Sequence, residues 1–185
     1  MTAIPQTAGS LYLEEVRAQL HKLKETTEKA LAQTRDDDLF AQIDPENNSL
    51  AMLVQHLAGN LKSRWTDFLT SDGEKPDRDR DSEFLVAEGT SRAGLLERWE
   101  EGWRCLFSAL EALTDDDLTR TVLIRAEPHS VIRAINRQLG HTAYHVGQIV
   151  LLARHFAGDR WQTLSVPRGG TREFNARMFG ESDPK

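Results

Sequence analysis

The chain contains two histidines four residues apart, in the segment His141-Thr-Ala-Tyr-His145, and a third, His56, far upstream. On a helix, side chains four apart lie one above the other on one face, with Cβ atoms roughly 5–6 Å apart. Two imidazoles so placed can reach one divalent ion at about 2.0–2.1 Å. We therefore predict that His56, His141 and His145 ligate one metal ion. Taken singly, each is better explained as a partly buried histidine with a hydrogen-bond partner.

One familiar use of such a pair is excluded. In peptidases of the zincin type a glutamate directly follows the first histidine and acts as general base. Thr142 occupies that position here. Peptide hydrolysis of that type is therefore not expected.

Four segments are predicted to form the helices that position these histidines. Each has apolar residues at steps of three and four, the pattern of an amphipathic helix. The predicted helices cover about residues 11–33, 50–70, 91–113 and 130–156, with Ser10 and Ser49 as N-caps of the first two and Gly158 just past the last. This pattern predicts an all-α fold, a four-helix bundle, in a single domain over residues 1–185.

The connections differ in length. Residues 71–90 hold Gly, Pro and alternating charges, which predicts a long surface crossover between the second and third helices. Residues 159–185 are predicted to form a tail of loop plus a short helix.

The first and third helices are each followed by Asp-Asp-Asp-Leu and then by the next helix. This faint repeat fits two similar helical hairpins, although acidic turns before helices are common.

The polar residues of the second and fourth helices are the candidates for the site. In helical projection His141 and His145 lie at the edge of the apolar arc of the fourth helix. His56 lies at the edge of the apolar arc of the second helix. Arg64 lies within the apolar arc of the second helix, where a charge is costly unless it is paired or faces a cavity. It is predicted to pair with Asp67 or an acid on another helix, to extend its aliphatic stem so that the charge reaches solvent, or to hold an anionic substrate group beside the metal.

Two neighbours of His145 complete the list of candidates. Tyr144 and Gln148 could orient a bound water or a substrate carbonyl, or could simply point between helices. The remaining histidines, His21, His129 and His155, are given ordinary roles at the surface or at helix ends.

Composition narrows the class of protein. Among 185 residues, 23 are Lys or Arg and 29 are Asp or Glu, for a net charge of −6, and no basic cluster stands clear of acids. Nucleic acid is therefore not an expected partner. No apolar run approaches the ~20 residues of a membrane span. The single Cys105 cannot form an intramolecular disulfide and no export signal is visible, so a cytoplasmic protein is expected.

Three stretches carry a family resemblance: VQHLAGNLKSRWTDFLTSDGEK at 54–75, WEEGWRCLF at 99–107 and INRQLGHTAYHVGQIV at 135–150. With the helix order and the three histidines, the chain resembles the DinB-like superfamily of metal-binding four-helix bundles, in a bacterial branch of unknown function. The resemblance implies helices running up, down, down, up, with the crossover between the second and third. It also implies His56, His141 and His145 as ligands of zinc or nickel, and a homodimer.

The resemblance says less about activity. Some members of the superfamily conjugate low-molecular-weight thiols to electrophiles, and a related branch isomerises maleylpyruvate with a thiol cofactor. By this analogy the chain is expected to be a metal-dependent enzyme on a small soluble substrate, with thiol S-transfer favoured and hydrolysis second. Fold and metal site do not fix the chemistry.

Two other hypotheses stay open. In one, the protein is a non-catalytic, stress-associated metal-binding bundle in which the ion only ties two helices together. In the other, it is a purely structural helical dimer whose three histidines bind no metal. Three protein ligands leave coordination positions open, as in catalytic rather than structural sites, and this favours the enzyme.

Overall fold

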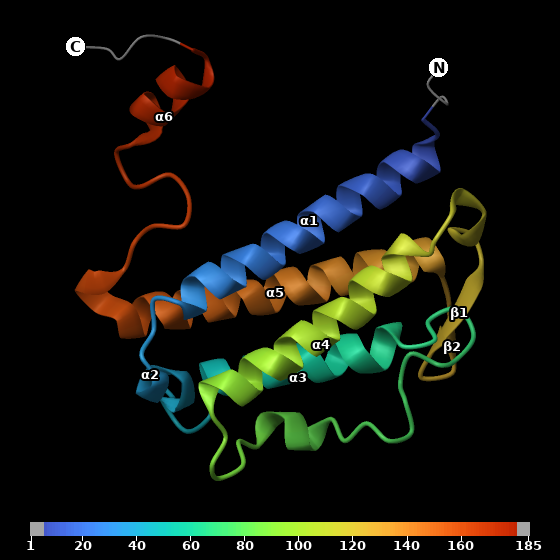
Figure 1. Ribbon diagram of the computed structural model, residues 1–185, viewed down its shortest axis with the longest axis horizontal. Coiled ribbons are helices and arrows are strands. Elements are labelled where there is room, and N and C mark those ends of the chain that lie inside the picture. The colour runs from blue at the N-terminus through green and yellow to red at the C-terminus, as the bar shows by residue number, and fades with distance from the viewer. Residues whose placement is uncertain (1–5, 181–185) are drawn as a thin grey trace.

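The computed structural model describes residues 6–180, and this part of the chain forms six α-helices and one β-hairpin. Four long helices build a bundle: α1 (Ala8–Leu31), α3 (Leu50–Trp65), α4 (Arg92–Glu111) and α5 (Val131–Ala157) (Figure 1). The prediction of an all-α bundle is confirmed. The predicted domain limits, 1 and 185, lie outside the described residues.

The helix directions also agree with the prediction. Helices α1 and α5 run one way along the bundle, and α3 and α4 run the other way (Figure 1). The order is therefore up, down, down, up. A long crossover returns from the end of α3 to the start of α4 and contains the short 3-10 helix η1 (Asp81–Phe84). Helix α3 packs mainly against α4, and α1 packs mainly against α5.

Side-chain caps fix where the helices begin. The hydroxyls of the serines before α3, α4 and α5 each accept a backbone N–H three residues on, from Met52, Gly94 and Arg133. Helix α1 begins earlier than predicted, because Thr7 is its N-cap and Ser10 is the third helical residue. The two hydroxyls bond reciprocally to each other's backbone N–H, both at 3.0 Å, so Ser10 completes a capping box.

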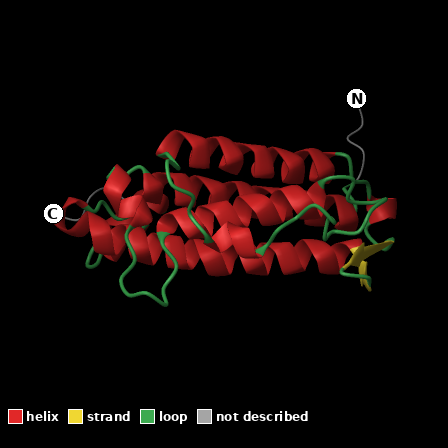
Figure 2. Ribbon diagram, turned by 90° about the horizontal axis from the view of Figure 1, so that it is seen from below, coloured by secondary structure: helices red, strands yellow, loops and turns green. Residues whose placement is uncertain are grey.

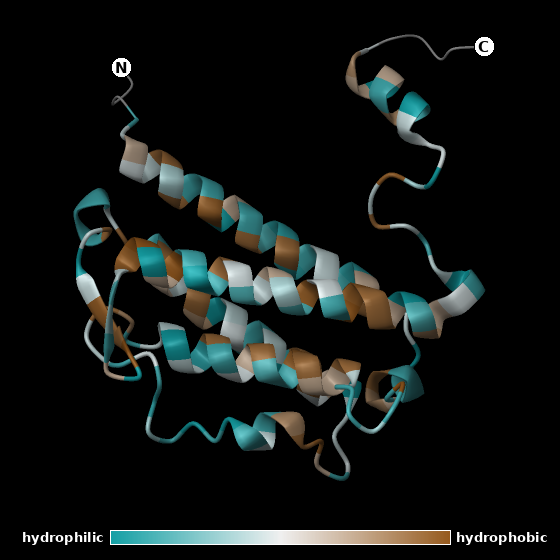
Figure 3. Ribbon diagram, turned by 180° about the vertical axis from the view of Figure 1, so that it is seen from behind, coloured by the Kyte–Doolittle hydropathy of each residue, from teal (hydrophilic) through white to brown (hydrophobic). Residues whose placement is uncertain are grey.

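The buried face of each helix forms one continuous core. Hydropathy varies along each long helix as expected of amphipathic helices, whereas the crossover is mostly hydrophilic (Figure 3). The largest buried side chains include three tryptophans, Trp65, Trp99 and Trp103. Within the described residues, none of the helices combines the length and the apolar composition needed to cross a bilayer.

Two elements were not predicted. Helix α2 (Asp36–Phe40) is a single short segment, and β1 (Thr121–Ile124) pairs antiparallel with β2 (Glu127–Ser130) at one end of the bundle (Figure 2). The hairpin turn, Arg125-Ala126, lacks the Asn-Gly or Asp-Gly that usually marks such turns, yet both residues have positive φ, 56° and 60°. The Asp72 carboxylate accepts both of their N–H groups, at 2.8 and 2.7 Å. A contact from a distant part of the chain therefore holds the turn.

The helix ends near the crossover and the tail complete the fold. Helix α3 ends at Trp65 rather than near residue 70, because Asp67 takes a positive φ of 50° that a helix does not allow. Short 3-10 helices η2 (Asp115–Asp117) and η3 (Gly158–Arg160) follow α4 and α5. The predicted short tail helix is α6 (Thr171–Met178), which lies away from the four long helices (Figures 1 and 3).

Candidate metal centre

His56 is positioned by α3 and by the crossover. Its side chain is 3% exposed, and its Nδ1 lies 2.8 Å from Glu83 Oε2 in η1. Phe84 stacks on the ring at 4.7 Å. Because an ionised carboxylate can only accept, Nδ1 carries the hydrogen and Nε2 presents its lone pair on the opposite side.

The crossover brings Glu83 to α3 because Gly59 leaves room for it. A Cβ at Gly59 would lie 2.4 Å from Glu83 Oε1. Arg78 holds the carboxylate from the other side, with Nε 2.7 Å from Oε1 and an Nη atom 2.9 Å from Oε2. Burial opposes ionisation of Glu83, but the hydrogen bonds from His56 and Arg78 outweigh it and hold the carboxyl pKa below its ordinary value.

Helix α5 supplies the other two histidines from successive turns. The rings of His141 and His145 are 4.6 Å apart between centroids and nearly perpendicular. His145 Nδ1 lies 2.7 Å from Gln148 Oε1, one turn further on. An amide oxygen only accepts, so this Nδ1 also carries the hydrogen and Nε2 is left free.

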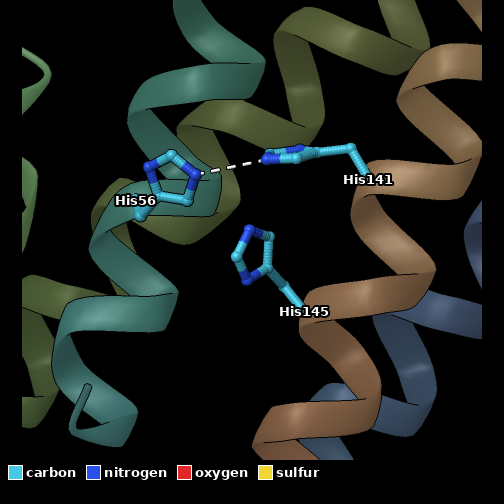
Figure 4. A group of neighbouring side chains, drawn as sticks. All are labelled: His56, His141 and His145. Carbon is cyan, nitrogen blue, oxygen red and sulfur yellow. Dashed lines mark hydrogen bonds between the residues drawn. The ribbon is translucent and has the colours of Figure 1, made fainter. Parts of the chain in front are cut away.

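The three imidazoles converge on one point between α3 and α5 (Figure 4). One ring nitrogen of each lies within 4.8 Å of the others, and His56 Nε2 is 3.2 Å from His141 Nε2. Two nitrogens on one divalent ion, each about 2.1 Å from it, are roughly 3.0–3.4 Å apart at tetrahedral or octahedral angles. The donor set and the spacing of the His56–His141 pair therefore fit a metal ion, whereas the 4.8 Å limit for the whole group is wider than this spacing. The His56–His141 distance also suits a hydrogen bond between neutral imidazoles.

The surroundings keep the α5 histidines neutral, which is the form that ligates a metal. Burial, with the positive charge of neighbouring histidines and arginines, lowers the pKa of His141 to about 3. The pKa of His145 is also lowered, mainly by burial and in spite of its hydrogen bond to Gln148. At neutral pH both rings therefore offer lone pairs without having to release a proton.

The other predicted candidates separate into one pocket residue and two neighbours of His145. Arg64 is 5% exposed and lines a cavity beside His56 and His141. Tyr144 stacks edge-on to His145 but is 65% exposed and does not line that cavity. Gln148 bonds to His145, so its observed contact orients the imidazole ring of His145. The alternative pairing of Arg64 with Asp67 is wrong, because no carboxylate lies within 4.0 Å of its guanidinium among residues 6–180.

Two sequence interpretations need correction. The crossover is not wholly a surface segment, because the side chains of Arg78 and Glu83 are only 5% and 8% exposed. Nor does His129 have a surface role, because it is 2% exposed. The sequence could have indicated that Glu83 is buried, because it directly precedes the apolar run Phe84-Leu-Val86. Nothing in the local sequence marks Arg125 as a cavity residue.

Comparison with known proteins gives one result at the family level. A family model described as a protein of unknown function, DUF1572, matches residues 7–170. The match begins at the N-cap of α1 and ends just before α6, so it includes the bundle and all three histidines. No curated protein matches the chain.

Proposed function

The chain belongs to the DUF1572 family of unknown function, and from the geometry of its histidine cluster we propose that it is a divalent-metal protein that acts as an enzyme on a small soluble substrate. The convergence of one ring nitrogen from each of three imidazoles within 4.8 Å carries this proposal. His56, His141 and His145 would hold one zinc or nickel ion per chain. The resemblance to the DinB-like superfamily supports the same three ligands.

The residues around the cluster support a reactive rather than a closed site. Three protein ligands leave positions free for a substrate or water. When bound, zinc or nickel supplies Lewis-acid chemistry, which polarises a carbonyl or lowers the pKa of a thiol or water toward neutrality. Glu83 and Gln148 fix the tautomers of His56 and His145, so that both Nε2 lone pairs face the site. A cavity beside His56 and His141 gives a small molecule access.

Within this proposal we favour thiol S-transfer, with a low-molecular-weight thiol as one substrate, and place hydrolysis second. The support is the family analogy. The test is thiol-dependent turnover of a panel of electrophiles by the zinc- and nickel-loaded protein. Turnover that requires both the thiol and the three histidines supports transfer, whereas turnover without a thiol supports hydrolysis.

The first experiment concerns the metal itself. Protein purified without an affinity tag or added metal is analysed by mass spectrometry as wild type, His145→Ala and His155→Ala. We expect about one zinc or nickel per chain in the wild type and in His155→Ala, whose changed side chain is exposed and outside the cluster, and none in His145→Ala. Wild-type protein that contains no metal and does not bind zinc on titration would contradict the proposal.

A second candidate function is a non-catalytic bundle in which the ion only joins α3 to α5. One observation favours it: the three ligands come from two helices that are distant in the chain. His56 on α3 and His141 on α5 are 85 residues apart in sequence. In that case zinc raises the melting temperature of the wild type, as in the enzyme, but no substrate in the panel is turned over. A metal-free structural dimer predicts no effect of zinc on melting.

We also propose a homodimer and a cytoplasmic location. Tyr144 and Leu151, seven residues apart on α5, are 65% and 67% exposed and supply apolar surface for helix-face contact. Light scattering of the wild type and Leu151→Asp tests the dimer. The single cysteine, Cys105, is free and only partly exposed, as suits a reducing compartment.

A further inference from the structure

A small cavity of about 180 Å³ adjoins the histidine cluster, and positive side chains dominate its wall. His56 and His141 line one part of it. The rest of the lining contains two amides and five arginines: Asn60, Gln138, Arg64, Arg78, Arg80, Arg125 and Arg137. No carboxylate lies in this lining. The helices, the crossover and the hairpin each contribute at least one of the arginines.

Nearby acids neutralise only part of this charge. Glu83 and Glu74 both pair with Arg78, at 2.7 and 3.0 Å, and Glu74 also lies 3.4 Å from Arg125. Within residues 6–180, the only carboxylate paired with Arg80 is that of the exposed Asp81, at 3.9 Å. Among the described residues, Arg64 and Arg137 have no carboxylate within 4.0 Å. The cavity therefore has more positive than negative charge.

Arg64 is the most unusual of these residues. It is 95% buried, and its Nε has no hydrogen-bond partner within the described part of the chain. Asn60, one turn earlier, is 94% buried and its Oδ1 likewise lacks a partner. A Cβ at Gly73 would lie 3.0 Å from Arg64 Cδ, so the crossover packs closely on the arginine stem. Buried polar groups are normally satisfied. The Arg64 Nε donor lacks an acceptor, which an oxyanion supplies, whereas Asn60 Oδ1 lacks a donor, which an oxyanion does not supply.

Two further contacts orient cavity arginines. His129 Nδ1 lies 3.0 Å from the Glu127 carbonyl and therefore carries the hydrogen, so its Nε2 accepts from Arg137, at 3.3 Å. Arg125 sits in the hairpin turn with positive φ that Asp72 holds. Left-handed conformations of non-glycine residues cost free energy and persist where the surroundings over-determine them. Here the strained turn places a guanidinium at the cavity.

We propose that this cavity binds a compact oxyanion, a carboxylate or a phosphate, on a small substrate whose reacting part lies at the histidine cluster. The role of the anion as part of a substrate rests on the proposed function, although its binding to the arginines does not. Guanidinium groups bind both kinds of oxyanion in bidentate fashion. The cavity volume is well above the roughly 10–15 Å³ that a single water needs, so a compact anionic group fits and a polymer does not.

The experiment measures binding of inorganic phosphate and of malonate by calorimetry, at constant ionic strength, with methylammonium as the cationic control. Wild type is compared with Arg64→Met, which keeps the size but not the charge, and with Arg154→Gln, an exposed arginine of α5 outside the cavity. We expect at least one anion to bind the wild type and Arg154→Gln equally, and Arg64→Met roughly tenfold or more weakly. Methylammonium should not bind.

Each arm is run on chelator-treated protein and on zinc-loaded protein, so that the two proposals can fail separately. Arg64-dependent anion binding by a protein that takes up no zinc would support the cavity and contradict the metal. Zinc uptake without anion binding would overturn the cavity proposal. Arg137→Gln, at an exposed position, is the second variant if Arg64→Met does not fold. Preference for phosphate or for malonate identifies the oxyanion, and equal binding by all variants overturns the inference.

Discussion

Helix α3 has two faces of opposite character. Toward α4 it packs backbone against backbone, because a Cβ at Gly102 would lie only 2.7 Å from the Ala58 carbonyl oxygen. The large rings of Trp99 and Trp103 on α4 are fully buried in the core. Toward α5 the same helix presents polar side chains at successive turns, His56, Asn60 and Arg64, which line the cavity.

We propose that the two faces divide stability and ligand binding between them. The α4 face is close-packed and buries large apolar side chains, so it contributes free energy of folding. The region between α3 and α5 holds three buried polar atoms without partners in the described residues, Asn60 Oδ1, Arg64 Nε and His141 Nδ1, whereas the α4 side holds one, Trp103 Nε1. Such atoms cost free energy. Their concentration beside the cavity supports the proposal that a ligand binds there.

The largest expected effect compares one substitution on each side of α3. Trp99→Ala removes a fully buried ring and its hydrogen bond to Glu28, and should lower the free energy of unfolding by about 3–5 kcal/mol. Arg64→Met replaces a buried, unpaired charge by an apolar chain of similar size and should leave stability unchanged or raise it by about 1 kcal/mol. Urea unfolding in chelator-treated buffer measures both. Equal losses would contradict the division.

The second prediction concerns metal affinity. Glu83→Gln keeps the shape of the side chain but replaces the carboxylate that accepts from His56 Nδ1. Loss of such a partner typically weakens metal binding about 10- to 100-fold. Zinc titration against a competing chelator measures it, with Glu88→Gln in the exposed part of the crossover as control. Unchanged affinity would mean that Glu83 serves only the packing of the crossover.

The third prediction uses two helical glycines. Gly102→Ala places a methyl group against the Ala58 backbone and should destabilise by about 1–2 kcal/mol, although alanine is the better helix former. Gly140→Ala, in α5, meets nothing within 4 Å and should stabilise by up to about 1 kcal/mol. Thermal unfolding of both variants checks the pair. If both substitutions change the stability in the same direction, the close α3–α4 contact is not required for stability.

The smallest expected effect concerns the hairpin turn beside the cavity. Burial alone would raise the pKa of the Asp72 carboxyl, but hydrogen bonds from the N–H groups of Glu74, Ala126 and Arg125 lower it below its ordinary 3.8. Its contribution to stability is therefore present above about pH 4 and is lost as the pH falls through the lower folded value. Asp72→Ala should cost about 1 kcal/mol at pH 7, and the difference from wild type should shrink as the pH falls through that lowered pKa.

Urea unfolding of wild type and Asp72→Ala at several pH values checks this. Asp79→Ala is the control, because Asp79 accepts similar N–H bonds but lies in the crossover, away from the hairpin. Arg125-dependent anion binding should weaken in Asp72→Ala and not in Asp79→Ala. If Asp72→Ala loses the same unfolding free energy at acidic pH as at pH 7, the charge of the carboxylate does not hold the turn.

The helices, the cluster and part of the cavity could be predicted from local sequence. The three-four spacing of apolar residues places four helices, and Ser49 and Gly158 mark helix ends where the structure has them. The spacing of His141 and His145 indicates a shared helix face, and the position of Arg64 in an apolar arc indicates a cavity or a partner. The start of α1, the end of α3, the helix α2 and the hairpin could not be placed. Each depends on which of several residues caps the helix, or on a contact between segments that are distant in the sequence.

By itself, the sequence determined which residues can do chemistry and on which helix faces they lie, because helical periodicity is a local property. Only the tertiary structure decided what those residues meet. Glu83 reaches His56 because Gly59 leaves room for the crossover, and Arg125 reaches the cavity because Asp72 holds a turn 53 residues away. These contacts join segments with no shared period, so their pairing follows from packing of the whole chain.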